Sequence, residues 1–235
     1  MIFRLFVVTL HNLLNELLSK DGCSLCNHSK IKMKIEDLRR YYDSLCEKLK
    51  NGTPDIVLND DRAHNSVIER FMLDSSKTVC MYCGEMSVFR RRFYAHIDSS
   101  IAENETEENG KTLGTILKDD VITSLRLFMD KPDAKLHIFF EKYDAAYLED
   151  LIDRSLFLEG MSIGKINLYK LDDNLFLKDG VVHTSLTDTN IIRIERNSST
   201  HEAICAINAS GDIVQNVENT FKSMFEVGEK IKLMN

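Results

Sequence analysis

Proline and glycine are scarce in this chain, with two prolines and ten glycines in 235 residues, which argues against a loop-rich all-β protein. Positive charge is also in deficit, because 30 Lys and Arg face 37 Asp and Glu, for a formal charge of −7. Non-specific nucleic-acid binding depends on basic residues that neutralise phosphates, so net charge does not favour nucleic acid as a partner. A local patch could still bind phosphate. The densest one is Arg90, Arg91 and Arg92, which can equally be a solvated helix face.

Long apolar runs and export signals are lacking as well. The most apolar stretch, residues 1–18, is too short and too polar after Leu10 to span a bilayer, so no membrane partner is expected. It has one basic residue, Arg4, and no small-residue cleavage site, which argues against a secretory signal. The six cysteines are therefore expected to be reduced thiols or metal ligands, and the protein is expected in the cytoplasm.

Helical spacing dominates the first 52 residues. Apolar residues recur at helical intervals over residues 3–18, and a second helix is predicted from Lys34 to Lys50, before Asn51-Gly52 ends it. Its apolar positions form a short heptad seam that needs a partner helix: Ile35, Leu38, Tyr42, Leu45 and Leu49. Residues 1–52 are thus predicted to form a helical hairpin, with residues 1–50 mediating self-association or binding a protein partner. The alternative is that both helices cover the core of the following domain.

Strand and helix patterns alternate from residue 53 to residue 235. Strands are predicted at 55–58, 78–83, 136–140, 165–169, 181–186, 191–195 and 203–207, and helices at 61–72, 85–97, 113–129, 144–157 and 213–225. The polar stretch 100–112 is predicted to be a loop. Strands that alternate with helices and end in hairpins indicate an α/β domain, a mixed β-sheet flanked by helices.

Cysteine spacing offers one candidate metal site. Cys23, Cys26 and His28 lie in the loop between the two N-terminal helices, and two thiolates at this spacing can reach one zinc ion, with His28 or Cys46 as further ligands. Zinc is the one cofactor that the sequence suggests. Cys80 and Cys83 have the same spacing but lie on a predicted strand, where an odd separation puts them on opposite faces. They are expected to be small core residues.

A second candidate site is the predicted hairpin that opens with His183 and turns at residues 187–190. The order of elements over residues 54–230 resembles one domain of the phospholipase D superfamily, which carries a His-x-Lys-x-x-x-x-Asp motif on such a hairpin. In that family the His attacks phosphorus and the Lys neutralises phosphate. His183 takes the nucleophile position, but Ser185 stands in place of the Lys and Asn190 in place of the Asp. Asp188 could be the motif Asp if the hairpin is two residues shorter.

The resemblance implies a degenerate domain with weak or no hydrolase activity, because Ser185 carries no charge. Arg193 could replace the missing Lys only if it faces the same side as His183. The leading hypothesis is a non-catalytic binding or assembly subunit of a larger intracellular complex, which the resemblance links to nucleic-acid or defence systems. One alternative is a phosphodiesterase or nuclease that uses His183 in a dimer, and another is a zinc-containing regulator. His183 can also be an ordinary strand histidine.

Overall fold

The computed structural model describes residues 34–59, 61–84, 86–100, 110–140, 144, 146–171, 183–197 and 202–232. Within them lies an eight-stranded mixed sheet of order β1-β7-β6-β5-β2-β3-β4-β8, which confirms the predicted fold class. Its strands are β1 Asp55–Asn59, β2 Thr78–Cys83, β3 Lys135–Phe140, β4 Ile166–Lys170, β5 Thr184–Thr187, β6 Ile192–Asn197, β7 Glu202–Ile207 and β8 Glu229–Lys230.

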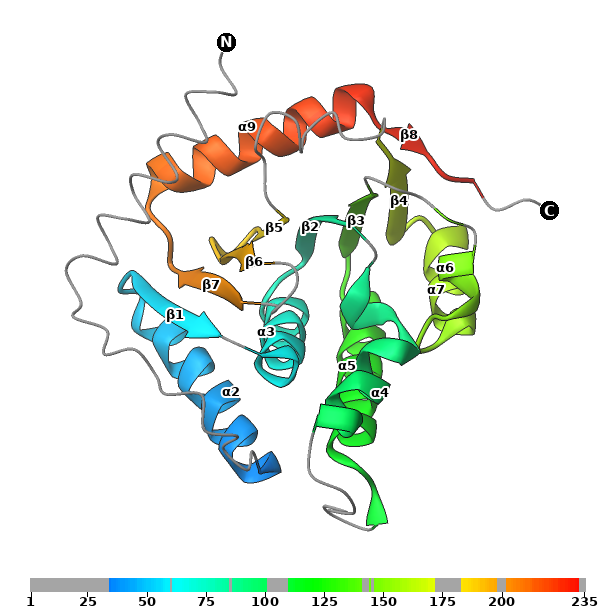
Figure 1. Cartoon of the computed structure of the whole chain (residues 1–235). Coiled ribbons are helices and arrows are strands. Elements are labelled where there is room, and N and C mark those ends of the chain that lie inside the picture. The colour runs from blue at the N-terminus through cyan, green and yellow to red at the C-terminus, as the bar shows by residue number, and fades with distance from the viewer. Residues whose placement is uncertain are drawn as a thin grey trace.

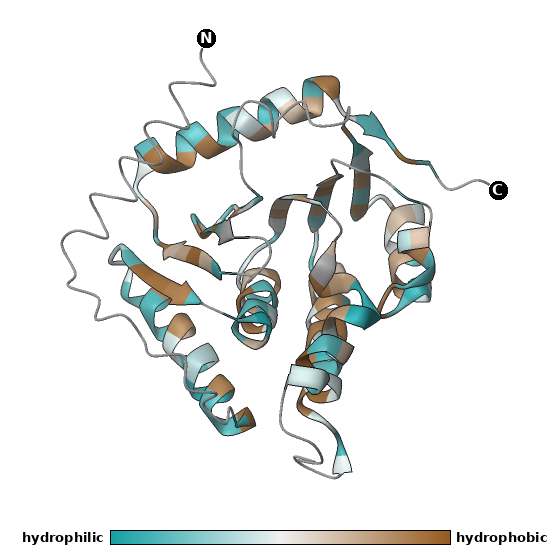
Figure 2. Cartoon of the chain, viewed as in Figure 1, coloured by the Kyte–Doolittle hydropathy of each residue, from teal (hydrophilic) through white to brown (hydrophobic). Residues whose placement is uncertain are grey.

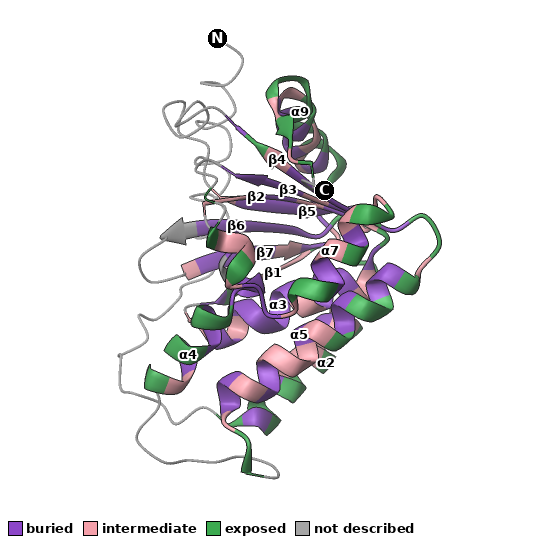
Figure 3. Cartoon of the chain, turned by 90° about the vertical axis from the view of Figure 1, so that its right-hand side faces the viewer, coloured by how far each residue is buried: buried purple, intermediate pink, exposed green. Residues whose placement is uncertain are grey.

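Helices cover the two faces of this sheet unequally (Figures 1 and 3). On one face lie α2, α3, α4, α5 and α7, whereas α9 crosses the other face. Hydrophobic and hydrophilic residues alternate along α9, as an amphipathic helix over a sheet requires (Figure 2). The helices are α2 Ile35–Asn51, α3 Arg62–Ser75, α4 Arg91–Ser100, α5 Leu113–Asp130, α6 Ala146–Glu149, α7 Arg154–Ser162 and α9 Gly211–Val227, with a 3-10 turn η1 Ser87–Phe89.

Parallel and antiparallel pairing meet at β2. β2, β3 and β4 are parallel neighbours, while β5 joins β2 from the other side in the antiparallel direction. β5, β6 and β7 then continue as antiparallel neighbours, and β1 pairs antiparallel with β7. In sheets of this kind, ligands bind outside the carboxyl ends of the parallel strands. The carboxyl end of β2, at Cys83, is therefore the place to look for a site.

The helix α2 belongs to the main hydrophobic core. Ile35, Leu38 and Leu45 are fully buried within the cluster that also contains the apolar faces of α3 and α5. Gly52 adopts a left-handed conformation with φ of 69°, and it ends the helix where predicted. The heptad seam thus finds its partner inside the same chain, which supports the alternative in which α2 covers the α/β core. A domain boundary at residue 52 stays a prediction, and residues 1–33 lie outside the described part.

Two predicted helices differ from those observed. The helix expected at 85–97 begins only at Arg91, because Met86 has a positive φ of 53° and residues 87–89 form a 3-10 turn. The helix expected at 144–157 is divided into α6 and α7. Between them, Asp150 accepts a backbone hydrogen bond from Arg91 and Ile152 donates one to Phe89. Periodicity along the sequence cannot reveal that pairing, because its partners come from another segment.

No helix in the described ranges is long and apolar enough to cross a membrane.

Candidate functional site

A cavity of about 600 Å³ opens at the carboxyl ends of β2 and β3. Side chains of α3, η1, α4 and α6 line it together with the near ends of β5 and β6. Its wall is divided in character, since aromatic and aliphatic residues of η1 and α4 face charged residues of α3 and β6. The residues that carry polar groups into it are Arg62, Asn65, Glu69, Arg92, His96, His183, Ser185, Arg193 and Glu195.

The central contact joins His183 and Glu195 across the β5–β6 hairpin. His183 Nδ1 lies 2.6 Å from Glu195 Oε2, and the backbone N–H of Glu195 donates to the carbonyl of His183. A carboxylate on Nδ1 fixes the ring orientation and stabilises the imidazolium form. Gly84 leaves room for this ring, because a Cβ at that position would lie 3.2 Å from His183 Cε1. The His183 ring also contacts Tyr82 edge to face, with centroids 5.6 Å apart.

Arg193 supplies the positive charge inside the cavity. It pairs with Ser185 in the hairpin register, so it faces the same side and stands beside the position that a Lys would take in the resembling family. Its Nε and Nη2 both donate to Asn65 Oδ1, at 3.0 and 2.6 Å. Its guanidinium also lies within 4 Å of two carboxylates, at 3.7 Å from Glu69 and 3.9 Å from Glu195. The charge of Arg193 is therefore largely engaged by protein groups.

Glu69 is a buried carboxyl whose negative charge is only weakly balanced by a nearby positive charge. Its side chain is 7% exposed, and its contact with Arg193 exceeds hydrogen-bond distance. Burial raises the pKa of Glu69 to about 7, an effect that Arg193 opposes and Glu195 reinforces. The same environment raises the pKa of the Cys205 thiol to about 12, mainly through burial, with Arg193 acting in the opposite direction. The cavity thus contains a carboxyl that changes charge near neutral pH.

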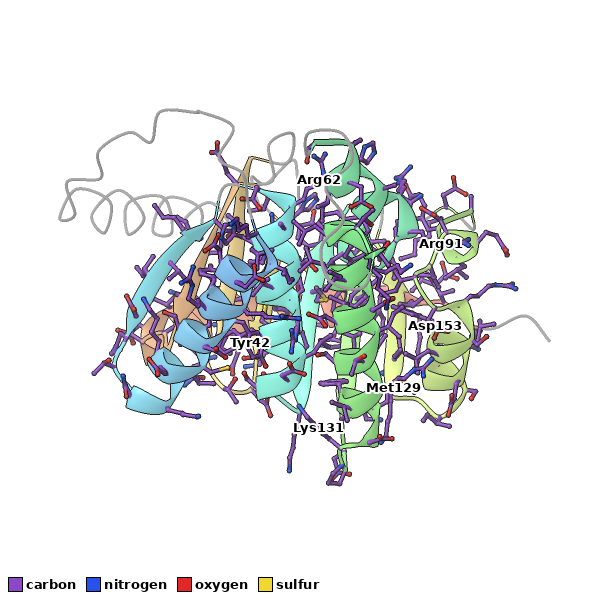
Figure 4. All side chains as sticks on the ribbon, turned by 90° about the horizontal axis from the view of Figure 1, so that it is seen from below. Tyr42, Arg62, Arg91, Met129, Lys131 and Asp153 are labelled. Atoms are coloured by element: carbon purple, nitrogen blue, oxygen red, sulfur yellow. The ribbon has the colours of Figure 1, made fainter. Side chains whose placement is uncertain are left out.

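The run Arg90 to Arg92 is not a uniform solvated face. Arg90 is buried, stacks over Tyr147 and donates to Asp150 Oδ2 at 3.2 Å. Arg91 and Arg92 are exposed, each within 4 Å of the Asp150 carboxylate, and Arg92 also lines the cavity. Seen from the helical side, Arg62 and Arg91 lie at the same end of the molecule, and Lys131 lies at the opposite end (Figure 4). Arg62 and Arg92 therefore bring two basic side chains to the cavity from α3 and α4.

The four residues predicted from the motif are separated by the length of β5. His183 and Ser185 line the cavity, but Asp188 and Asn190 lie beyond the other end of the strand. Asp188 Oδ1 there accepts hydrogen bonds from the backbone N–H groups of Lys77 and Thr78, at 3.0 and 3.1 Å. Asn190 adopts a left-handed φ of 59° in the turn. The structure thus gives Asp188 and Asn190 positions that hold the turn and the start of β2.

The proposed zinc ligands Cys23, Cys26 and His28 lie outside the described residues. Cys46 is half-buried on α2, and burial raises the pKa of its thiol. Cys80 and Cys83 face opposite sides as predicted, since Cys80 packs on the α9 side and Cys83 on the other. In the described ranges, no three His, Cys, Asp or Glu side chains are grouped as a metal site.

Sequence patterns missed most of the cavity, although two signals were present. Arg62, Asn65 and Glu69 repeat at steps of three and four, which places these polar residues on one face of α3. Glu195 lies opposite His183 once the hairpin turn is centred at residues 188–190, so a correct register would have paired them. Arg193 connects the polar face of α3 with the His183–Glu195 pair. This connection depends on tertiary contacts, which the sequence pattern does not reveal.

No family model matches the chain, and no curated protein matches its sequence. Among solved structures it is similar to TrmBL2, an archaeal chromatin protein with a novel mode of DNA binding. That match has 15% identity, covers 83% of this chain and 64% of the other, and has a TM-score of 0.46. The chain is also similar to Nuc, a phospholipase D family member from Salmonella typhimurium, at 8% identity, covering 77% of this chain and all of the other with a TM-score of 0.47. Both likenesses are weak, and no function follows from them.

Proposed function

We propose that this chain is a non-catalytic binding subunit whose cavity holds a ligand that carries a phosphate or a similar anion. The observation that carries this proposal is the engagement of Arg193. Its Nε and Nη2 are both bound to Asn65, and two carboxylates lie within 4 Å of its guanidinium. An arginine held in this way lends charge to the cavity, but it is not arranged to concentrate that charge on a reacting phosphoryl group.

Anion binding is supported by the groups at the mouth of the cavity. Arg62 stands in the first turn of α3 and lines the cavity. Arg92 and His96 extend from α4 on the opposite wall. The aromatic wall provided by Phe89 and Phe93 suits a ligand with an apolar part beside its anionic group.

Binding of diphenyl phosphate to the full chain, measured by calorimetry, tests the proposal. This diester carries both an apolar part and one negative charge. We expect Arg62→Ala to weaken its affinity by about tenfold or more, because a charge-assisted hydrogen bond contributes on the order of 1.5–3 kcal/mol. The matched control is Arg40→Ala on α2, an exposed arginine whose side chain is 78% accessible. An equal effect of both substitutions, or no binding by the unaltered chain, would contradict the proposal.

A phosphodiesterase is the second candidate, because His183 Nδ1 is bound by Glu195 at 2.6 Å and the ring lies in the cavity. A histidine oriented by a carboxylate has the arrangement that nucleophilic or general-base catalysis needs. Hydrolysis of bis(4-nitrophenyl) phosphate and of single-stranded DNA decides between the candidates, with His183→Ala as control. Background signal from both proteins is expected. Turnover that disappears in His183→Ala would replace the binding proposal with this one.

We further propose that the chain works within a larger assembly, with any partner surface in residues 1–33. The support comes from α2, whose apolar residues are already buried in the chain's own core while its outward positions are charged. A chain that begins at Lys34 should remain folded, since it keeps Ile35, Leu38 and Leu45, and should lose self-association. Light scattering of the two forms measures this. The same number of subunits per particle in both forms would place the partner surface elsewhere.

The proposed zinc site at Cys23, Cys26 and His28 is tested by elemental analysis of protein purified without tag or chelator. Near-stoichiometric zinc that is lost in Cys23→Ser would support a zinc-containing regulator, because both thiolates at this spacing serve one ion. Zinc content near zero would remove that proposal.

A further inference from the structure

Two carboxylates of the cavity share one arginine. Glu69 and Glu195 both approach the guanidinium of Arg193, which is 10% exposed. Glu195 also accepts from His183, so one carboxylate has a close partner and the other does not. A further negative charge placed in this cavity would meet two carboxylates around one arginine. Repulsion of this kind favours protonation of one acid.

Of the two carboxyls, Glu69 is the one whose neutral form costs least. Its nearest charged neighbour among the described interactions is Arg193 Nε at 3.7 Å, beyond hydrogen-bond distance, and its side chain is 7% exposed. Glu195, by contrast, has a close partner, because its Oε2 lies 2.6 Å from His183 Nδ1. Because a buried charge without close partners is unfavourable, a proton that enters the cavity should reside on Glu69.

We propose that the cavity takes up its anionic ligand together with one proton, and that Glu69 holds this proton. The inference rests on the proposed ligand-binding function and adds that ligand binding is coupled to proton uptake. The proton comes from solvent and adds to a carboxylate oxygen of Glu69. With Glu69 neutral, the charge of Arg193 is offset by Glu195 alone, so the cavity attracts an anion more strongly. Proton and anion therefore strengthen each other's binding, and by linkage the effect is reciprocal.

Burial supports the assignment, because it raises the pKa of Glu69 to about 7 before any ligand is present. An anion in the cavity would raise that pKa further. Titratable and charged groups reach this cavity or Glu69 from every element around it. They are Arg62 of α3, Tyr82 and Cys83 of β2, Arg92, Tyr94 and His96 of α4, Tyr147 of α6, His183 before β5, Arg193 and Glu195 of β6, and Cys205 of β7.

Among these, His183 is the serious competitor. Tyr94 and Cys205 are raised in pKa by burial and stay protonated at neutral pH, so neither can take up a proton there. The arginines are always charged. His96 is exposed on α4 and His183 is bonded to Glu195, so a histidine is the group to be separated from Glu69 by experiment.

Calorimetry with diphenyl phosphate tests the coupling in the full chain. The charge of this diester is constant from about pH 6 to about pH 9, so every proton taken up belongs to the protein. Repeating the titration in two buffers with different heats of ionisation counts these protons. At about pH 8 we expect close to one proton per bound ligand, and an affinity that falls by up to about tenfold per pH unit above about pH 7. This measurement needs no variant.

Glu69→Gln assigns the proton, because Gln keeps the shape and removes the titration. This variant should bind diphenyl phosphate with no proton uptake and with an affinity nearly independent of pH, while His183→Asn should retain the uptake. Uptake that persists in Glu69→Gln and disappears in His183→Asn would overturn the inference. Binding by the unaltered chain without uptake would overturn it too and leave the binding function standing. Absence of binding at every pH would overturn the proposed function and the coupling with it.

Discussion

The two ends of β5 use polar residues in opposite ways. At the end where the strand begins, His183 bonds to Glu195, and side chains of α3 and β6 face one another around an open cavity. At the end where it stops, polar side chains bond to backbone. Asp188 accepts from two N–H groups at the start of β2, and Thr187 Oγ1 accepts from the N–H of Ile191.

A lysine at the end where β5 stops also bonds to backbone groups. Lys131 Nζ donates to the carbonyls of Leu73, Asp74 and Ser76, which closes the carboxyl end of α3. Polar groups that bond to the backbone at the ends of elements stabilise a turn. Polar groups that share charges with one another beside a cavity remain available to one. The two ends differ in what their polar side chains bond to, and not in residue type. The residues of one sequence motif can therefore lie at both ends with different roles.

The largest effect is expected from Arg193→Met at the cavity end. It leaves Glu69 and Glu195 buried without their shared cation, and breaking a buried ion pair in this way costs on the order of 3–5 kcal/mol. Urea unfolding at about pH 8 measures this cost. The matched control is Arg154→Met, whose exposed partner Glu149 lies 3.1 Å away and contributes about 1 kcal/mol or less. Similar losses in both variants would show that the cavity network is not tightly coupled.

Glu69→Gln should change how stability depends on pH. The pKa of Glu69 rises from 4.5 to about 7 on folding, so the native state binds more protons than the unfolded state in that window. Stability therefore falls as pH rises from about 4.5 to about 7, by about 3 kcal/mol from this group. Gln removes this cost. The free energy of unfolding of the variant should therefore rise relative to that of the unaltered protein as pH increases across this window. Parallel stability curves would mean that Glu69 is charged throughout.

Asp188→Ala tests the opposite end. It removes the acceptor for the N–H groups of Lys77 and Thr78, which costs about 1 kcal/mol of unfolding free energy because both groups can still reach water. Affinity for diphenyl phosphate should not change. Asp130→Ala, an exposed acid at the end of α5, is the control for loss of charge. Weaker ligand binding in Asp188→Ala alone would return this residue to the functional site.

The smallest effect is expected from Gly84→Ala. The added Cβ would lie 3.2 Å from His183 Cε1, so the ring must shift by a few tenths of an ångström. We expect a stability loss of about 1 kcal/mol or less and a several-fold weaker affinity for diphenyl phosphate. At Gly211 a Cβ would meet nothing within 4 Å, so Gly211→Ala is the matched control. Unchanged affinity in Gly84→Ala would mean that the position of His183 does not matter to the ligand.

The local spacing of apolar residues was sufficient to predict the order and type of most helices and strands. The strands β1 to β7 were predicted within a few residues, because burial on a sheet leaves a short apolar run between turn residues, whereas the two-residue strand β8 was not predicted. The opposite orientations of Cys80 and Cys83 followed from strand parity. The helices around residues 85–97 and 144–157 were misjudged, since backbone pairing between Phe89 and Ile152 interrupts both segments.

The sequence by itself determined the fold class and the presence of a polar hairpin that opens with His183. Only the tertiary structure decided which charges surround that histidine. Arg193 reaches Asn65 across 128 residues of chain, and Glu69 lies one turn further along α3. These contacts depend on how β5 pairs with β2 and on how α3 packs on the sheet. Periodicity indicates which face of a helix or strand is buried. It does not indicate which other helix or strand that face packs against.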